Sequence, residues 1–318
     1  MNKNIKLSII IFFILANSKT LLSQGIPGGG GAERNEKNFS FVPVPYINYD
    51  RSLGLSVGAL PMCMYNLSKR DTISPSSISG LFGMYTTNDS WFTMAFNKLY
   101  LYQDKWRLTA VVGTGNINFQ FLYDNPFQPT TIEYSTLAAF TLIEAQRKIY
   151  DNLYFGVNYS YVKFDTEFDI ELPVDTRQIV KLHGLGLVLS YDKRDDVYYP
   201  RKGHITNINF KSNPKFMNDL ESNKLEMDFS SFFEMKNKKN VIATRAYLGV
   251  GLGDLTFNQQ FVVGRTDVRG YSQGEYRGDQ LFSLQGEYRW NPLKKVGFVG
   301  FLGTAMIFNG INESDNGK

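Results

Sequence analysis

The feature that most restricts the fold of this chain is a hydrophobic period of two residues that begins near Phe39. Side chains on a β-strand point alternately to the two faces of a sheet, so such a strand meets an apolar medium on one face and water on the other. Similar alternation at residues 153–161 and 282–290 leads us to expect about thirteen strands. In the clearest strand, the apolar positions are Leu225, Met227, Phe229, Phe233 and Met235, and the charged positions are Lys224, Glu226, Asp228, Glu234 and Lys236.

The lengths of the connections help to choose between a membrane barrel and a soluble β-sandwich, which gives similar alternation. Outer-membrane barrels have short periplasmic turns and longer extracellular loops, and the expected connections alternate in this way. The exception is the link 192–203, which is long but falls on the short-turn end. Tight turns are expected at residues 103–105, 150–152, 237–240 and 291–295, and longer links at residues 124–131, 167–182, 214–223 and 254–279.

Composition also favours a transmembrane antiparallel β-barrel. Aromatic residues make up 15% of the chain, and the mean hydropathy is slightly negative. Strands of such a barrel place apolar side chains on the lipid and polar ones in the lumen, which keeps the mean hydropathy low. In a soluble fold the same aromatics would be core or rim residues. Those near strand ends, where amphipathic rings would lie at the lipid headgroups, are Tyr100, Tyr102, Trp106, Tyr150, Tyr154 and Trp290.

The amino terminus has the layout of a secretory signal peptide. Two lysines precede an apolar run at residues 7–16, and a polar segment with the small residue Ser23 follows it. The run is shorter than the roughly 20 residues of a membrane-spanning helix, and an apolar helix packed on a core is the alternative. We expect a signal peptide at residues 1–23, a flexible Gly-rich leader at 24–38 and the barrel domain at 39–318.

Charge and cysteine content limit the remaining function classes. The formal charge is +4 and falls to about +1 without the lysines of the signal peptide, so nothing indicates a nucleic-acid partner. The single cysteine, Cys63, excludes an internal disulfide framework.

We find no motif that indicates an enzyme, a metal site or a cofactor. His183 and His204 are the only histidines, and neither lies in a recognisable nucleophile motif. A hydrolase embedded in the barrel would need a Ser/His/Asp constellation that the sequence does not supply. The mixed charges at residues 192–196 could form a cation site, but they are more typical of a solvated turn. No small-molecule substrate is indicated.

Two segments resemble the BamA/TamA-like superfamily of outer-membrane assembly and secretion barrels, the bacterial surface antigen family. The first, around Tyr191 and Lys193, is similar to the family's D-x-R-D and P-x-x-G elements, and the second is similar to its V-R-G-F/Y motif. The second falls in the longest loop, between the eleventh and twelfth expected strands, where the family has it. The motif residues are Asp192, Arg194, Asp195, Pro200 and Gly203 in the first segment and Val268, Arg269, Gly270 and Tyr271 in the second.

The resemblance implies that Arg269 lies inside the barrel and fixes a long loop in the lumen. A guanidinium withdrawn from water needs an acidic or carbonyl partner. We expect Glu287 to be that partner, because it alternates with apolar residues on the polar face of the twelfth strand, together with Gln285 and Arg289. The resemblance supports this choice, since the family has an acidic residue on that strand. The alternative is that Arg269 is a solvated loop charge.

The chain departs from the family at several points. Gly303 stands where the family's Phe-x-Asp-x-Gly element has its Asp, so a second acidic partner for Arg269 is missing. The segment before Phe39 is too short for the family's POTRA domains. By comparison with the sixteen-stranded type expected, the last strands are missing, so we expect a chain truncated at its C-terminus.

The resemblance implies a non-enzymatic barrel, exported to the bacterial outer membrane, that assists insertion or translocation of proteins there. The alternative is a passive pore or structural barrel that does not transport proteins. The partners implied are outer-membrane lipids, client outer-membrane proteins and accessory lipoproteins.

Overall fold

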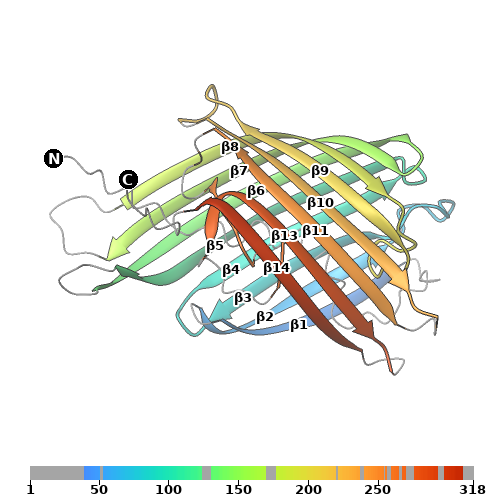
Figure 1. The fold of residues 1–318 in the computed structure, drawn as a ribbon, viewed down its shortest axis with the longest axis horizontal. Coiled ribbons are helices and arrows are strands. Elements are labelled where there is room, and N and C mark those ends of the chain that lie inside the picture. The colour runs from blue at the N-terminus through green and yellow to red at the C-terminus, as the bar shows by residue number, and fades with distance from the viewer. Residues whose placement is uncertain are drawn as a thin grey trace.

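The computed structural model describes residues 39–310 except 51–52, 124–129, 170–176, 220, 237–239, 254, 256–258, 265–266, 270–275 and 293–296. The expected signal peptide and leader lie outside the described residues. Antiparallel strands form one sheet (Figure 1). Its strands are β1 (Phe39–Asp50), β2 (Gly54–Tyr65), β3 (Ser77–Thr86), β4 (Trp91–Leu101), β5 (Trp106–Tyr123), β6 (Thr130–Tyr150), β7 (Leu153–Asp169), β8 (Arg177–Asp192), β9 (Gly203–Asn213), β10 (Ser222–Glu234), β11 (Val241–Leu252), β12 (Phe261–Val262), β13 (Arg277–Trp290) and β14 (Phe298–Gly310).

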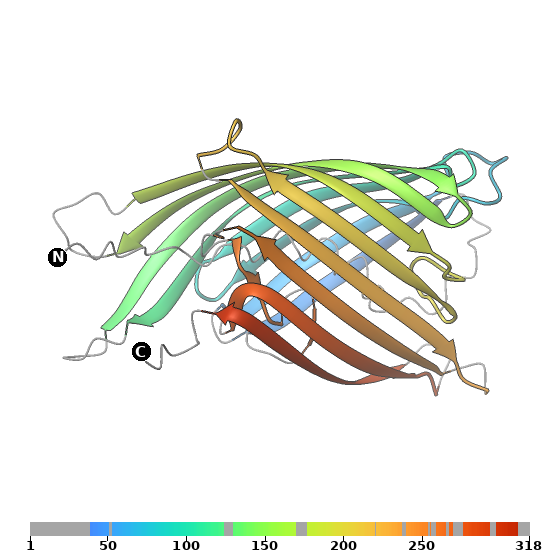
Figure 2. The same ribbon diagram turned by 45° about the horizontal axis from the view of Figure 1, so that its top comes forward.

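Each long strand pairs with the next one along the chain, and the sheet curves around a central space (Figure 2). The two-residue β12 pairs only with the start of β13. The thirteen longer strands confirm the expectation of about thirteen. Within the described residues, β1 pairs with β2 alone and β14 with β13 alone. No described helix is long and apolar enough to cross a membrane.

The connections divide the sheet into two ends. We call the end with connections β2–β3, β4–β5, β6–β7, β8–β9, β10–β11 and β13–β14 the turn end, and the opposite end the loop end. The expected turns at residues 103–105 and 150–152 fall at the turn end, as does the long link 192–203. The loop-end link expected at 167–182 is shorter than predicted, because β7 continues to Asp169 and β8 begins at Arg177. Arg177 stabilises this extension with two hydrogen bonds of 2.7 Å to Asp165.

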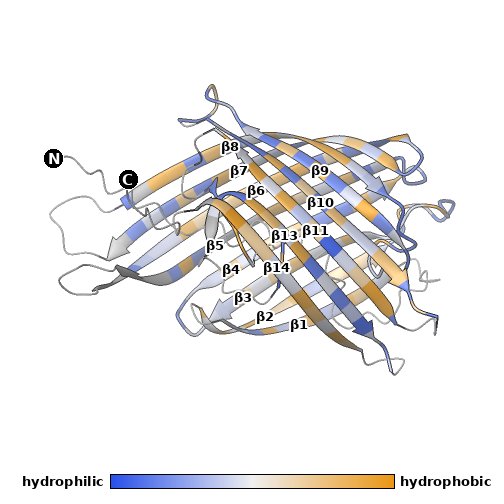
Figure 3. Cartoon of the chain, in the orientation of Figure 1, coloured by the Kyte–Doolittle hydropathy of each residue, from blue (hydrophilic) through white to orange (hydrophobic). Residues whose placement is uncertain are grey.

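The predicted alternation is confirmed in β10. Phe229 and Phe233 are 43% and 55% exposed on the convex face. Lys224 is buried and pairs in register with Lys211, and the concave face of β10 also carries Glu226. Apolar and polar residues accordingly alternate along this strand (Figure 3).

The concave face is different in β2 to β7, where its centre is apolar. Phe92, Met94 and Phe96 of β4 are at most 7% exposed, and Phe92 stacks on Phe140 with ring centres 5.9 Å apart. The Phe140 ring lies where a side chain at Gly113 would project, so that glycine makes room for it. The expectation of a polar lumen therefore does not hold for this half of the sheet.

Candidate functional site

The connection between β11 and β13 runs along the concave face and contains the V-R-G-Y segment. Phe261 of β12 packs over Gly249, with its ring centre 6.5 Å from that of Tyr247. Val268 is 4% exposed and belongs to the same apolar cluster. Phe261 and Val268 are therefore two apolar anchors that hold this connection against the wall.

Arg269 lies beside β13 in a chain of polar contacts. Its Nη2 is 3.4 Å from Oε1 of Glu287, and its backbone N–H donates to Oε1 of Gln285 at 2.8 Å. Gln285 in turn donates to Glu287 at 2.9 Å. The guanidinium carbon is also 5.8 Å from the ring centre of Phe301. The structure thus brings Arg269 and Glu287 together, whereas Gly270 and Tyr271 lie outside the described residues.

The packing around Gly303, which the resemblance matches to the family's aspartate, leaves no room for a side chain. A Cβ at Gly303 would overlap Cγ2 of Val268. The neighbouring residue of the motif therefore fills the space that an acidic side chain would need. In this chain Arg269 has Glu287 and the Phe301 ring as side-chain contacts on β13 and β14.

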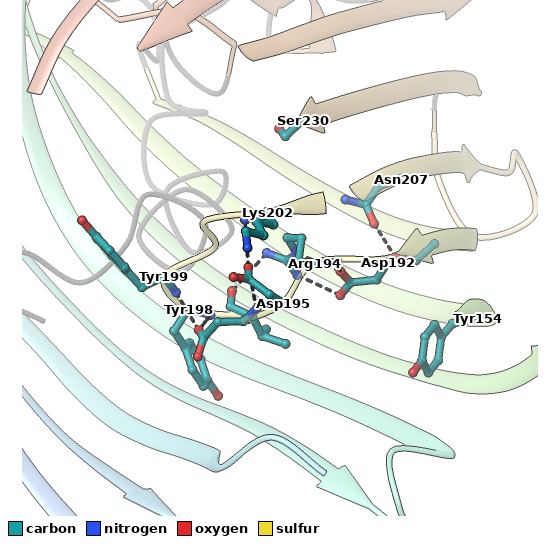
Figure 4. A network of polar contacts seen from close by, with 12 residues as sticks. Tyr154, Asp192, Arg194, Asp195, Tyr198, Tyr199, Lys202, Asn207 and Ser230 are labelled. Atoms are coloured by element: carbon teal, nitrogen blue, oxygen red, sulfur yellow. Dashed lines mark hydrogen bonds and ion pairs between the residues drawn. The ribbon is translucent and has the colours of Figure 1, made fainter. Parts of the chain in front are cut away.

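The first motif forms the β8–β9 connection at the turn end, shown in Figure 4. Asp192, at the end of β8, accepts from Nε and Nη2 of Arg194 at 2.8 and 2.9 Å. Oδ1 of Asp195 accepts from the backbone N–H groups of Arg201 and Lys202 at 2.9 and 3.1 Å. The two aspartates hold the two ends of the connection. They bind arginine and backbone amides, and the described residues contain no group of three or more acids, histidines or cysteines that could hold a metal ion.

Gly203 closes the same connection for a conformational reason. Its φ is +92°, and a Cβ there would overlap the carbonyl oxygen of Lys193. Glycine is required on both grounds: other residues rarely adopt this backbone conformation, and any side chain would collide with that oxygen.

A buried arginine that the sequence analysis did not single out joins this connection to the wall. Arg107 of β5 contacts Asp104 at 2.7 Å and Asp192 at 3.0 Å. Its guanidinium carbon lies 3.8 Å from the ring centre of Tyr154, whose hydroxyl donates to Asp104 at 2.5 Å. Alternation along β5 places residue 107 on the concave face, and this could have drawn attention to it, because an arginine that points away from lipid needs acidic partners.

The β8–β9 connection reaches widely separated parts of the sheet. The hydroxyl of Tyr198 donates to the carbonyl oxygen of Ser76, just before β3, at 2.5 Å. The hydroxyl of Tyr199 is 3.3 Å from Oδ1 of Asn291, just after β13. The connection therefore crosses the concave space at the turn end and is held near β3 and near β13.

The side chains of β13 link the two motifs. Nε of Arg289 is 3.3 Å from Oε2 of Glu287, and Nη1 of Arg289 donates to the carbonyl oxygen of Pro200 at 3.4 Å. A continuous path of contacts thus runs from Arg269 through Glu287 and Arg289 to Pro200. Gln285 and Arg289 were predicted to lie on the polar face of this strand, but the sequence analysis gave them no role.

Beside these contacts is a cavity of about 420 Å³. Its lining comes from β4 to β13 and includes residues of the β8–β9 connection together with Val268 and Arg269. Both cations and anions contribute to the lining, and Arg245 pairs with Asp228. Such a space suits polar or charged groups. Charged side chains that line it include Lys211, Lys224, Glu226, Asp228, Arg245 and Arg269.

Comparison with known proteins identifies the family. The model of the Omp85 superfamily domain matches residues 75–318. Among solved structures, BamA from Haemophilus ducreyi lacking POTRA domains 1–3 is similar, with a TM-score of 0.55 and 17% identity. CdiB from Acinetobacter baumannii is similar with a TM-score of 0.55 and 15% identity. At these identities the two structures support the fold alone.

Each match covers most of this chain but a smaller share of the matched structure. The BamA match covers 86% of this chain and 58% of that one, and the CdiB match covers 87% and 51%. This chain therefore spans little more than half of each relative. No curated protein matches the chain. The family model covers well over half of the sequence, and the chain belongs to the Omp85 superfamily.

Proposed function

We propose that this chain is a non-enzymatic outer-membrane barrel that assists insertion or translocation of proteins. The observation that carries the proposal is the contact of Arg269 with Glu287, which holds Val268 and Arg269 of the V-R-G-Y segment against the concave wall. A loop held inside a barrel can limit passage through the lumen and leave the strands to act on a client. Membership of the Omp85 superfamily supports the same role. Client outer-membrane proteins and accessory lipoproteins are the partners proposed.

The proposed orientation follows from the two ends of the sheet. Short turns of outer-membrane barrels face the periplasm and longer loops face outward. The turn end would therefore lie on the periplasmic side, and the β8–β9 connection would cross the lumen there. The lumen would then be obstructed by the β8–β9 connection at its periplasmic end and by the β11–β13 connection along its wall.

Assisted insertion can be measured directly. The chain is reconstituted into phospholipid vesicles, and a urea-unfolded outer-membrane barrel is added as client. Folding of the client is followed by its heat-modifiable gel mobility. We expect faster client folding than in empty vesicles, and a loss of the acceleration in Arg269→Ala. Arg177→Ala is the matched control, because Arg177 is 58% exposed at the loop end and contacts Asp165 there.

The second candidate is a passive pore, which the charged cavity of about 420 Å³ favours. A pore should give steady single-channel conductance in planar bilayers and should not accelerate client folding. Conductance without acceleration would replace the first proposal by the second. A chain that neither conducts nor accelerates folding would contradict both.

A further inference from the structure

A row of outward-facing side chains crosses four strands near the turn end. Trp106 of β5 lies beside Arg147 of β6, which lies beside Phe155 of β7. Phe155 in turn lies beside Leu189 of β8. The exposed fractions of Trp106, Phe155 and Leu189 are 37%, 43% and 36%. Arg147 is thus an exposed charge among apolar side chains that suit contact with lipid.

The contact of Arg147 is aromatic. Its guanidinium carbon lies 5.5 Å from the ring centre of Trp106. No carboxylate of the described residues forms an ion pair with it, and the row itself contains no acid. A cation over an indole ring is stabilised by the ring, but its hydrogen-bond donors stay available. Arg147 can therefore bind an anion from outside the chain.

Outward-facing cations at the loop end are arranged differently. Arg177 contacts Asp165 at 2.7 Å, and Lys163 lies 3.9 Å from the same carboxylate. Their charges are compensated within the protein. Arg147, Arg177 and Lys163 all face outward from the sheet. They differ because a carboxylate lies near Arg177 and Lys163, whereas no described carboxylate pairs with Arg147.

The position of Arg147 matches the depth of lipid headgroups. It lies three residues before Tyr150, the end of β6, which is about 10 Å along the strand. Lys105 is exposed in the adjacent turn, and its carbonyl accepts from the N–H of Lys148. Nζ of Lys148 is 3.9 Å from a largely exposed carboxylate, Asp151. Lys148 faces the concave side, where its Nζ lies 5.9 Å from the ring centre of Tyr154. The positive charges beside Trp106 are therefore Arg147 on the outward face and Lys105 in the adjacent turn.

We propose that Arg147, Trp106 and Lys105 form a binding site for the phosphate of an anionic phospholipid headgroup at the turn end. The planar guanidinium matches two phosphate oxygens, and the indole ring lies at the headgroup level. The acyl chains would lie along Phe155 and Leu189. This inference goes beyond the proposed function, because a passive barrel could have the same lipid site.

Fluorescence quenching by brominated phospholipids tests the site. Trp91 and Trp106 stand at opposite ends of the β4–β5 hairpin, and both are 37% exposed. Two single-tryptophan proteins are made, W91F/W290F to retain Trp106 and W106F/W290F to retain Trp91. Each is reconstituted into equal mixtures of phosphatidylglycerol and phosphatidylcholine in which one of the two lipids is brominated. We expect Trp106 to prefer phosphatidylglycerol about fivefold and Trp91 to show no preference.

Two further variants assign the preference to the arginine. In the protein that retains Trp106, Arg147→Gln should abolish the preference, while Arg147→Lys should keep most of it. Inorganic phosphate at matched ionic strength should not change the quenching, because it cannot replace a lipid. Equal preferences at Trp91 and Trp106 would overturn the proposal even if no Arg147 variant folds. A preference that survives in Arg147→Gln, or that inorganic phosphate removes, would also overturn it.

Discussion

The two halves of the concave face carry different kinds of inward-facing side chain. In β2 to β7 its centre is lined by buried apolar side chains, such as Phe92 and Phe140. In β8 to β13 it carries charged and amide side chains around a cavity, with Asp228 paired to Arg245. Strand pairing is continuous through both halves. The two halves therefore share one pattern of strand pairing, and the inward side chains decide whether a region is packed or can bind polar groups.

The largest effect is expected where the two halves meet at the turn end. Arg107→Met would leave Asp104 and Asp192 without their shared cation, because Arg107 is 11% exposed and contacts both. Breaking such a buried pair costs about 3–5 kcal/mol. The midpoint of urea unfolding in vesicles should fall accordingly. Arg177→Met is the control and should change the midpoint little, and equal effects of the two variants would show that the network does not stabilise the fold.

The next effect tests whether the apolar half is a packed core. Phe140→Ala removes a ring that is 3% exposed and should cost about 3 kcal/mol of unfolding free energy. Phe155→Ala removes the same ring from the convex face, where it is 43% exposed, and should cost clearly less. Heat-modifiable gel mobility compares the two variants. A larger loss for Phe155→Ala would contradict the assignment of a core to the concave face.

A smaller effect is expected in the polar half. Arg269 is 29% exposed, and its contact with Glu287 is 3.4 Å long, so solvent screening should limit the pair to about 1 kcal/mol. Arg269→Ala and Glu287→Gln should each make the loop more sensitive to protease. Because they remove one shared interaction, the double variant should lose less than the sum of the two single losses. Strict additivity would show that the two residues act independently.

The smallest effect concerns the β2–β3 connection at the turn end of the apolar half. Burial tends to raise the pKa of Asp71, but hydrogen bonds from Ser74 and the N–H groups of Gln103 and Ile73 lower it to about 2 from 3.8. The stability that the ionised Asp71 adds to the folded state is present above pH 3.8 and is lost as the pH falls through about 2.

Hydrogen exchange at Gln103 measures this contribution, because its N–H donates to Asp71 at 2.8 Å. Relative to its intrinsic exchange rate, the amide should lose protection as the pH falls from 3.8 through about 2, the pKa of Asp71 in the folded protein. In Asp71→Asn the protection should already be reduced at neutral pH and should not change across this range. If Asp71→Asn lost protection over the same pH range as the wild-type protein, the effect would belong to another group.

Much of the fold followed from local patterns, whereas the contacts between distant residues did not. Alternation in β10 and β13 gave the correct faces because each strand there separates apolar from polar side chains. The same reasoning assigned no face to β4, where Phe92 faces inward and Trp91 outward, so that both faces carry aromatics. Hydropathy alone cannot assign a face when both faces are apolar.

The site was predictable in part. The motif residues Asp192 and Arg269 were identified by resemblance, and the parity of β13 indicated Glu287. The roles of Arg107 and Arg289 depend on contacts with residues far away in the sequence, such as Asp192 and Pro200. One strand's pattern shows that such a side chain points inward but does not show which partner it meets.

The contact between Tyr198 and Ser76 has a consequence for the order of folding. The two residues are 122 positions apart, while each hairpin of the sheet joins strands that follow one another. Closing so long a segment costs more chain entropy than closing a hairpin. We therefore expect the strands from β3 to β8 to pair before the hydroxyl reaches its acceptor. Formation of this hydrogen bond would mark the completion of the first half of the wall, and a probe at Tyr198 would report a late folding event.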